Sequence, residues 1–289
     1  MGFQEKLKTG SFVVTTEVGP PRGISLEKTL QEIAPLKGRV DAVNVTDLQS
    51  SCLRMSALAA ALFVRDKGFE PILQMTCRDR NRLALQADLL ASAALGLNNI
   101  LVLTGDHPVL GDHPEAKPVF DLDAVQLMET VRLLNAGEDL GGHKLVGQAP
   151  RLFPGAVVNP GADPLEPEII KMEKKAQAGA RFFQTQAIFD VGLFEKFLAA
   201  VKHLRVPVLA GIVLLKSEKM ALHLNAHVPG IHVPDRLVAQ VRDARDKKAT
   251  AVDISARLIR DLKGMAAGVH LMPIGWHSVL PCLLDNINS

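Results

Sequence analysis

The feature that most constrains the fold of this chain is a regular alternation of short apolar segments with longer amphipathic ones. The short segments are rich in β-branched residues and cover residues 11–18, 41–47, 70–77 and 98–106. Each is followed by a run whose apolar residues recur with helical spacing. Nearly continuous apolar strands that alternate with amphipathic helices are typical of a parallel sheet covered by helices on both faces.

The second half of the chain continues this alternation less regularly. Further strands are expected over residues 155–160, 181–186, 206–215 and 268–275, with a helical insertion from about 234 to 267 before the last one. Residues 141–155 fit no unit and are expected to form an extra hairpin. Eight strand–helix units predict a (β/α)₈ barrel, a fold that takes about 250 residues as one domain. The prediction is therefore an α/β protein in which residues 1–289 form a single barrel domain.

Charge and cysteine content exclude several classes of protein. The chain has 33 basic and 31 acidic residues without a block of like charge, which argues against binding to nucleic acid or a membrane surface. The longest apolar run, residues 57–64, is far shorter than the ~20 residues that span a bilayer. The first residues lack a hydrophobic signal core, so a cytoplasmic protein is expected. The three cysteines are widely spaced without a C-x-x-C pair, which argues against a disulfide framework or a thiolate zinc site.

Polar residues recur where the predicted strands end. Glu17, Thr46, Thr76 and Asp106 end the first four strands at spacings of 29, 30 and 30 residues. In a barrel, the carboxyl ends of the strands meet at one mouth, where active sites of this fold are built. The threonines have an alternative interpretation as simple strand caps. The two carboxylates are expected close to the barrel interior, where an unexplained charge is costly.

The segment LTGDHPVLGDHP contains Gly-Asp-His-Pro twice and invites a metal-site interpretation. Only Asp106 ends a strand, whereas residues 107–114 read as a loop with proline and glycine. Loop neighbours this close seldom supply the three or four ligands of a metal site, so no metal is expected. Later in the chain, Lys174 and Lys175 belong either to a solvated helix face or to a phosphate site at the mouth.

The residues at these strand ends resemble a known family. The segments TTEVGPP, NVTD, QMTCRDR, NNILVLTGDHP, AVVNPGADP, KKAQAGARFFQTQAIFD and GIVLL, in this order, are similar to methylenetetrahydrofolate reductases over nearly the whole chain. The resemblance is closest to the short bacterial forms, including those of acetogen-type complexes. It implies a barrel that binds FAD or FMN non-covalently and reduces 5,10-methylenetetrahydrofolate to 5-methyltetrahydrofolate. Electrons would come from NAD(P)H or from a partner subunit.

The resemblance also implies roles for individual residues. Glu17 matches the general acid of the family, Asp106 the aspartate beside flavin and pterin, and Gln186 the folate-binding glutamine. Flavin-contact positions are occupied by Thr46, Gly105, Glu168 and Lys175. The chain departs from the common family pattern at Gln74, Thr104, Asn159 and Ala187, where many members have His, Arg, an aromatic residue and Phe. The first three of these are still expected in the flavin site, but the departures leave open the choice of flavin and a variant poor in flavin.

Two other functions stay open at this stage. A methyltetrahydrofolate-dependent methyltransferase is also a barrel that binds pterin, and it needs no redox cofactor. A non-catalytic subunit of a redox complex would have no use for Glu17, Asp106 and Gln186 together. The expected partners are a folate substrate and either further copies of this chain or a cysteine-rich subunit, with neither nucleic acid nor a membrane.

Overall fold

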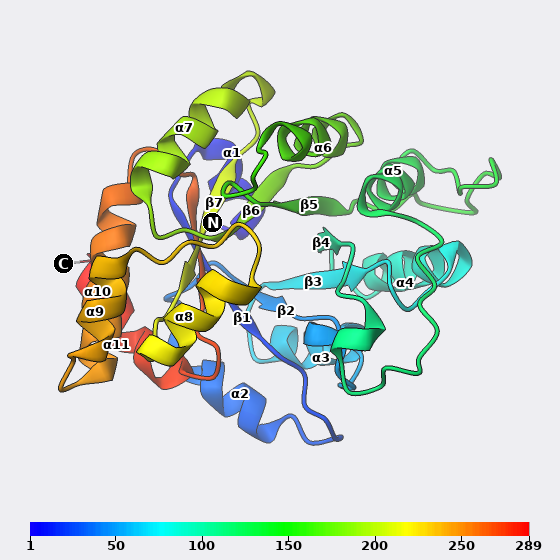
Figure 1. Ribbon diagram of the computed structural model, residues 1–289. Coiled ribbons are helices and arrows are strands. Elements are labelled where there is room, and N and C mark those ends of the chain that lie inside the picture. The colour runs from blue at the N-terminus through cyan, green and yellow to red at the C-terminus, as the bar shows by residue number, and fades with distance from the viewer. Residues whose placement is uncertain (289) are drawn as a thin grey trace.

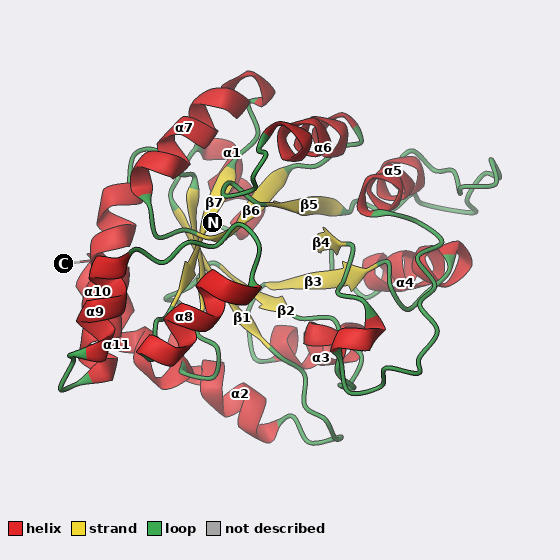
Figure 2. Ribbon diagram, viewed as in Figure 1, coloured by secondary structure: helices red, strands yellow, loops and turns green. Residues whose placement is uncertain are grey.

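The computed structural model describes residues 1–288 and has a closed barrel of eight parallel strands at its centre (Figures 1 and 2). The strands are β1 (Val13–Val18), β2 (Ala42–Val45), β3 (Pro71–Thr76), β4 (Asn99–Leu103), β5 (Phe153–Val158), β6 (Phe182–Ala187), β7 (Val208–Val213) and β8 (Gly268–Met272). Each strand pairs with the next in sequence, and β8 pairs with β1, which closes the barrel. The predicted (β/α)₈ fold is confirmed.

Helices surround the strands on the outside of the barrel (Figure 2). They are α1 (Phe3–Thr9), α2 (Glu27–Ile33), α3 (Ala57–Asp66), α4 (Arg82–Ala94), α5 (Ala124–Asn135), α6 (Glu166–Gln177), α7 (Val191–Val201), α8 (Glu218–His227), α9 (Asp235–Arg242), α10 (Lys247–Leu262) and α11 (Leu280–Asn288). The predicted insertion before the last strand is confirmed as α9 and α10. Within residues 1–288, no helix is both long and apolar enough to cross a membrane.

The prediction of a hairpin over residues 141–155 is wrong. Only one antiparallel bridge forms there, between Glu138 and Lys144, and it lies at the start of the segment. Asp139 stabilises the turn between them, because its carboxylate accepts hydrogen bonds from the backbone N–H groups of Gly141 (2.8 Å) and His143 (2.9 Å). A local Asx-type turn therefore replaces the strand pairing.

The barrel interior changes from apolar to polar along the strands. Alternate residues of a strand face the same side, so the first inward residues, such as Val13 and Phe182, form an apolar layer. The next layer is polar and buried, and Asn44 Nδ2 donates a 2.7 Å hydrogen bond across the barrel to Gln184 Oε1. His270 faces the same layer from β8. Barrel interiors are usually filled by branched apolar side chains, so this polar layer marks the functional end.

The first helix closes the opposite end of the barrel. Phe3 and Leu7 of α1 are buried against the apolar layer, and the Phe3 ring lies edge-on to Phe182 with 5.2 Å between ring centroids. The backbone N–H of Phe3 donates to Glu70 (2.9 Å), and Lys6 pairs with Asp41 (2.5 Å). Because both carboxylates directly precede strands, α1 is tied to the strand starts and seals the amino-terminal end.

Candidate active site

A cavity of about 480 Å³ opens at the carboxyl ends of the strands. Most residues predicted to form the site line this cavity: Glu17, Gln74, Thr104, Gly105, Asp106, Asn159, Glu168 and Gln186. The other two, Thr46 and Lys175, are buried and absent from its lining. The structure therefore brings together predicted residues from five strands or the segments that follow them.

Glu17 lines the cavity from β1, beside the polar layer of the barrel. It is the next-to-last residue of β1, and its side chain is 14% exposed. Within residues 1–288, its carboxylate accepts no hydrogen bond, whereas its backbone oxygen lies 3.1 Å from Nε2 of His277. A half-buried carboxyl group with free hydrogen-bonding capacity at the head of a cavity is suited to exchange a proton with a ligand.

Asp106 lies in a loop and not at the strand end that the sequence had predicted. The fourth strand ends at Leu103, so Asp106 is in the following loop, and it is exposed instead of lying close to the interior. Gly105 shapes this loop with a φ of +90°, and a Cβ atom there would lie 3.1 Å from Cβ of Thr76 and 3.2 Å from Cβ of Arg78. The Gly-Asp pair therefore marks a sharp turn that only glycine fits, and this turn directs Asp106 over the cavity.

Arg78 is a buried cation beneath the mouth. Its guanidinium group, with a side chain 2% exposed, donates two 2.8 Å hydrogen bonds to the carboxylate of Asp79. It also donates to the backbone oxygens of Leu48 and Asp106, each at 3.2 Å. Leu48 follows β2 and has a φ of 46°, a conformation that needs external support in a non-glycine residue. Arg78 thus joins the loops after β2 and β4.

A second polar network fixes the end of β3. Oδ2 of the buried Asp47 accepts from the backbone N–H of Thr76 (2.9 Å), from its hydroxyl (3.0 Å) and from Arg80. Arg80 also pairs with Asp88 of α4 at 2.9 Å. These bonds use the Thr76 side chain for structure, which agrees with the alternative interpretation of this threonine as a strand cap.

Asn159, Glu168 and Lys175 bond to the protein itself. Oε1 of Glu168 accepts a 3.0 Å bond from the backbone N–H of Asn159, whose side-chain amide donates to the oxygen of Pro229 at 2.9 Å. Lys175 donates from Nζ to the oxygen of Val157 at 2.7 Å. Burial lowers the pKa of Lys175, an effect that nearby Glu168 partly opposes. Asn159 and Glu168 line one side of the mouth, Lys175 lies buried behind it, and their contact with flavin stays a prediction.

Gln186 is placed as its strand position predicted. It is the next-to-last residue of β6, and it lines the cavity together with Gln184. Its Oε1 accepts a 3.1 Å bond from the backbone N–H of Ala187, and its amide nitrogen has no partner within residues 1–288. The register of β6 against β7 shifts between Gln184 and Ala187, which sets the direction of this strand end. The Gln186 amide nitrogen is free to donate to a ligand.

The second Gly-Asp-His-Pro has a structural role. Asp112 accepts a 3.0 Å bond from the backbone N–H of Leu53 and forms an ion pair with Arg22. A Cβ atom on Gly111 would lie 1.9 Å from the oxygen of Ser51, so the two loops touch there. Asp112 therefore ties together the loops after β1, β2 and β4. Among residues 1–288, no three side chains of His, Cys, Asp and Glu gather as a metal-binding group.

Three residues near the cavity were missed by the sequence analysis. Asp47 and Arg78 were quoted only inside motifs, and His270 was not considered. His270 carries a usable signal, because alternation in GVHLM places it on the same face as Gly268 and Met272. Its position in the polar layer follows from that alternation once β8 is placed in the barrel.

Comparison with known proteins relates the whole chain to one family. The methylenetetrahydrofolate reductase family model matches residues 2–288. Methylenetetrahydrofolate reductase 2 of Schizosaccharomyces pombe is 24% identical over 98% of this chain and 46% of its own length. The probable methylenetetrahydrofolate reductase (NADPH) of Caenorhabditis elegans is 25% identical over 80% of this chain and 33% of its own. The chain thus spans less than half of these two relatives.

Shorter proteins match over most of both chains. The 5,10-methylenetetrahydrofolate reductase of Salmonella typhimurium is 24% identical over 88% of this chain and 82% of its own. Among solved structures, an uncharacterized protein from Clostridium thermocellum that binds two copies of 5-methyl-5,6,7,8-tetrahydrofolic acid has a TM-score of 0.66. It is 17% identical, and the match covers 99% of each chain. This likeness shows a shared fold.

Proposed function

The chain belongs to the methylenetetrahydrofolate reductase family, and from this premise we propose that it reduces 5,10-methylenetetrahydrofolate to 5-methyltetrahydrofolate with a flavin bound at the barrel mouth. The observation that carries the proposal is the set of free polar groups around one cavity. Glu17, Asp106 and Gln186 all line it, and within residues 1–288 none of their side chains forms a hydrogen bond with another side chain, although Nε2 of His270 lies 3.6 Å from Glu17. Such unused capacity suits a ligand rich in hydrogen-bonding groups.

The mouth fits the ring system of a flavin. A flavin ring offers several acceptors and one N–H donor, and the side-chain amide of Gln74 faces the cavity without a partner within the described residues. The buried hydroxyl of Thr46 also has no partner there, so a polar group is available beside the lining. The cavity volume lies within the range of about 300–1,000 Å³ that is usual for cofactor sites. When bound, the flavin supplies the hydride.

The residues of this chain supply the acid chemistry. Opening the five-membered ring of the substrate breaks a carbon–nitrogen bond, and the departing nitrogen needs a proton. Glu17 lies at the head of the cavity and donates that proton. Asp106, held by the turn at Gly105, lies over the cavity and stabilises the cation that forms on the substrate. Gln186 donates its amide hydrogen to the pterin.

A folate ligand and an external electron source complete the proposal. The Clostridium thermocellum protein of the same fold binds a methyltetrahydrofolate, which supports a folate in this mouth. Electrons come from NAD(P)H or from a cysteine-rich partner subunit, because the three cysteines of this chain lie on separate elements and offer no cluster site. The chain works as a homo-oligomer or in a complex with that subunit.

One set of measurements tests the proposal. Protein from a flavin-replete host is expected to show flavin absorbance or to take up FAD or FMN, and the reduced form is expected to be reoxidised by methylenetetrahydrofolate. Methyl transfer from methyltetrahydrofolate without any flavin uptake would instead support the methyltransferase. A protein that binds neither flavin nor folate would support the non-catalytic subunit.

A further inference from the structure

A buried histidine on β8 faces the carboxylate of Glu17. His270 is 4% exposed and lines the mouth cavity. Its Nε2 atom lies 3.6 Å from Oε2 of Glu17, slightly beyond hydrogen-bond length. Among residues 1–288, no lysine, no arginine and no other histidine brings a side-chain nitrogen within 4.0 Å of this carboxylate.

Thr15 contacts the other nitrogen of the His270 ring. Nδ1 of His270 lies 3.0 Å from Oγ1 of Thr15, and this hydroxyl donates to the backbone oxygen of Val269 at 3.4 Å. The proton storage proposed below requires that this hydroxyl give its hydrogen to the carbonyl and accept one from the ring, so that Nδ1 carries the hydrogen. In the neutral ring, the lone pair is then on Nε2, the atom that faces Glu17.

We propose that Glu17 and His270 hold one proton between them, and that His270 stores it for delivery through Glu17. The inference rests on the function proposed above. An isolated carboxyl group is almost fully ionised at neutral pH, whereas imidazole titrates in that range. A carboxylate within about 4–6 Å stabilises a charged imidazole, and the 3.6 Å between Nε2 and Oε2 places the two groups within that range.

The proton moves in two balanced steps. The Nε2–H of charged His270 first passes the shared proton to the Glu17 carboxylate and leaves a neutral ring. Glu17 then gives this proton to the departing nitrogen, which keeps the electron pair of the broken carbon–nitrogen bond, and the ring takes its next proton from water in the mouth. His270 thus acts through Glu17 as a positioning residue and never touches the substrate.

The other charged groups around the mouth are already engaged or lie in other loops. Asp47 bonds to Thr76 and Arg80, Arg78 bonds to Asp79, Glu168 bonds to the backbone of Asn159, and Asp106 lies in the loop after β4. Beside β1, His277 contacts the backbone oxygen of Glu17, and its Nδ1 lies 3.4 Å from Glu32. His270 is therefore the group that pairs with the Glu17 carboxylate.

The test measures folate reduction by pre-reduced protein over a range of pH. His270→Asn keeps a short polar group beside Thr15 but removes Nε2. We expect it to slow the reaction about 10- to 100-fold above neutral pH with little change in KM for folate. The loss is expected to shrink in acid, where a carboxyl group keeps its own proton. The double variant with Glu17→Gln should be no slower than Glu17→Gln alone. His223→Asn, exposed on α8, is the control.

Two kinetic outcomes would overturn the proposal: an equal loss at every pH, or additive effects in the double variant. Nitrogen-15 NMR of the His270 ring tests the shared proton without turnover. The ring signals are assigned by their loss in His270→Asn. The expected result is hydrogen on Nδ1 and a titration midpoint that falls in Glu17→Gln. A midpoint unchanged by Glu17→Gln refutes the shared proton. Absent folate reduction with a shifted midpoint would refute only the proposed function.

Discussion

Replacing Arg78 by methionine is expected to loosen the mouth and to weaken the whole protein. The substitution keeps most of the apolar stem but removes the guanidinium group that joins the loops after β2 and β4. Two backbone oxygens, those of Leu48 and Asp106, lose their donor. Asp79 loses its cation, but it is about one-third exposed and stays hydrated. The prediction therefore concerns chiefly the two loops.

The size of the effect follows from these contacts. Hydrogen bonds to charged groups contribute about 1.5–3 kcal/mol each, and removing one partner of a buried ion pair costs about 3–5 kcal/mol. Both bonds to the backbone are long at 3.2 Å, and water reaches both loops. We therefore expect Arg78→Met to lower the free energy of unfolding by about 2–4 kcal/mol. Because Asp106 moves with its loop, folate reduction is expected to fall by about 10²-fold, the usual effect of a 1 Å displacement.

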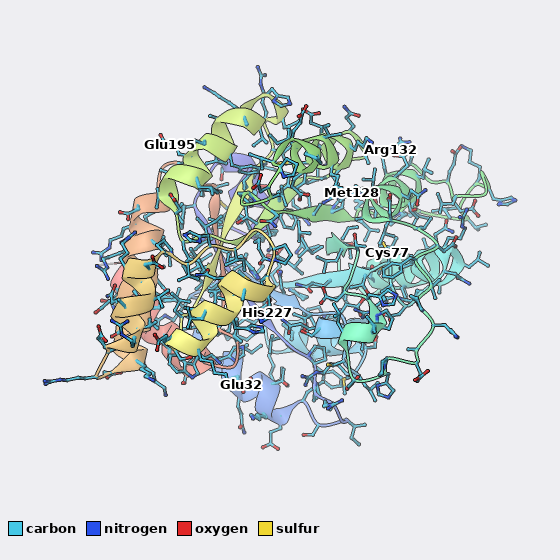
Figure 3. All side chains as sticks on the ribbon, in the orientation of Figure 1. Glu32, Cys77, Met128, Arg132, Glu195 and His227 are labelled. Carbon is cyan, nitrogen blue, oxygen red and sulfur yellow. The ribbon has the colours of Figure 1, made fainter. Side chains whose placement is uncertain are left out.

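Urea unfolding followed by circular dichroism measures the stability, and the folate half-reaction measures the second effect. Arg132→Met is the matched control, because Arg132 lies exposed on α5 (Figure 3) and, among the described residues, pairs only with Glu129 of the same helix. Loss of this surface ion pair is expected to lower the free energy of unfolding by at most about 0.5 kcal/mol. If Arg78→Met is as stable as Arg132→Met, the guanidinium group does not hold the loops together and the reasoning is wrong.

Three further predictions concern single side chains. Glu17→Gln is expected to leave flavin binding and flavin reduction near normal while folate reduction falls by at least about 10²-fold, and rapid mixing of each half-reaction separates the two. Gln186→Ala should lower kcat/KM for folate by about ten- to a hundredfold with flavin retained, and unchanged folate kinetics would remove Gln186 from the site. Burial, and to a smaller extent the charge of Asp123, raises the pKa of the Cys77 thiol to about 12, so a thiol reagent at pH 8 should modify exposed Cys282 and spare Cys77 (Figure 3) until the protein unfolds. Mass mapping of the modified peptides reads this out, and early modification of Cys77 would contradict it.

The barrel could be predicted because its signals are local. Each strand is a short apolar run, and each outer helix has one apolar face, so the alternation alone fixes the order of elements. Glu17 and Gln186 were placed correctly for the same reason, since two-residue alternation within a strand decides which side chains face inward.

The loops could not be predicted because their geometry depends on contacts between distant segments. Asp106 was expected at a strand end, but β4 stops at Leu103, and the turn at Gly105 is shaped by Thr76 and Arg78. Lys175 appeared free in the sequence, yet it bonds to the oxygen of Val157 on the neighbouring strand. The sequence of a single segment does not indicate which backbone oxygen a lysine side chain will contact.

Because α1 closes the amino-terminal end of the barrel, ligands can reach the cavity only from the carboxyl-terminal end. Phe3 and Leu7 fill the amino-terminal end, so every molecule that reaches Glu17 enters and leaves through the same opening. Under the function proposed above, a folate bound there would block the path of NAD(P)H, and bound NAD(P)H would block the folate. The two half-reactions would then occur one after the other, and the electrons would stay on the protein after the donor has left and before the folate binds. Steady-state rates would show this as parallel lines in double-reciprocal plots, with each substrate inhibiting the binding of the other at high concentration.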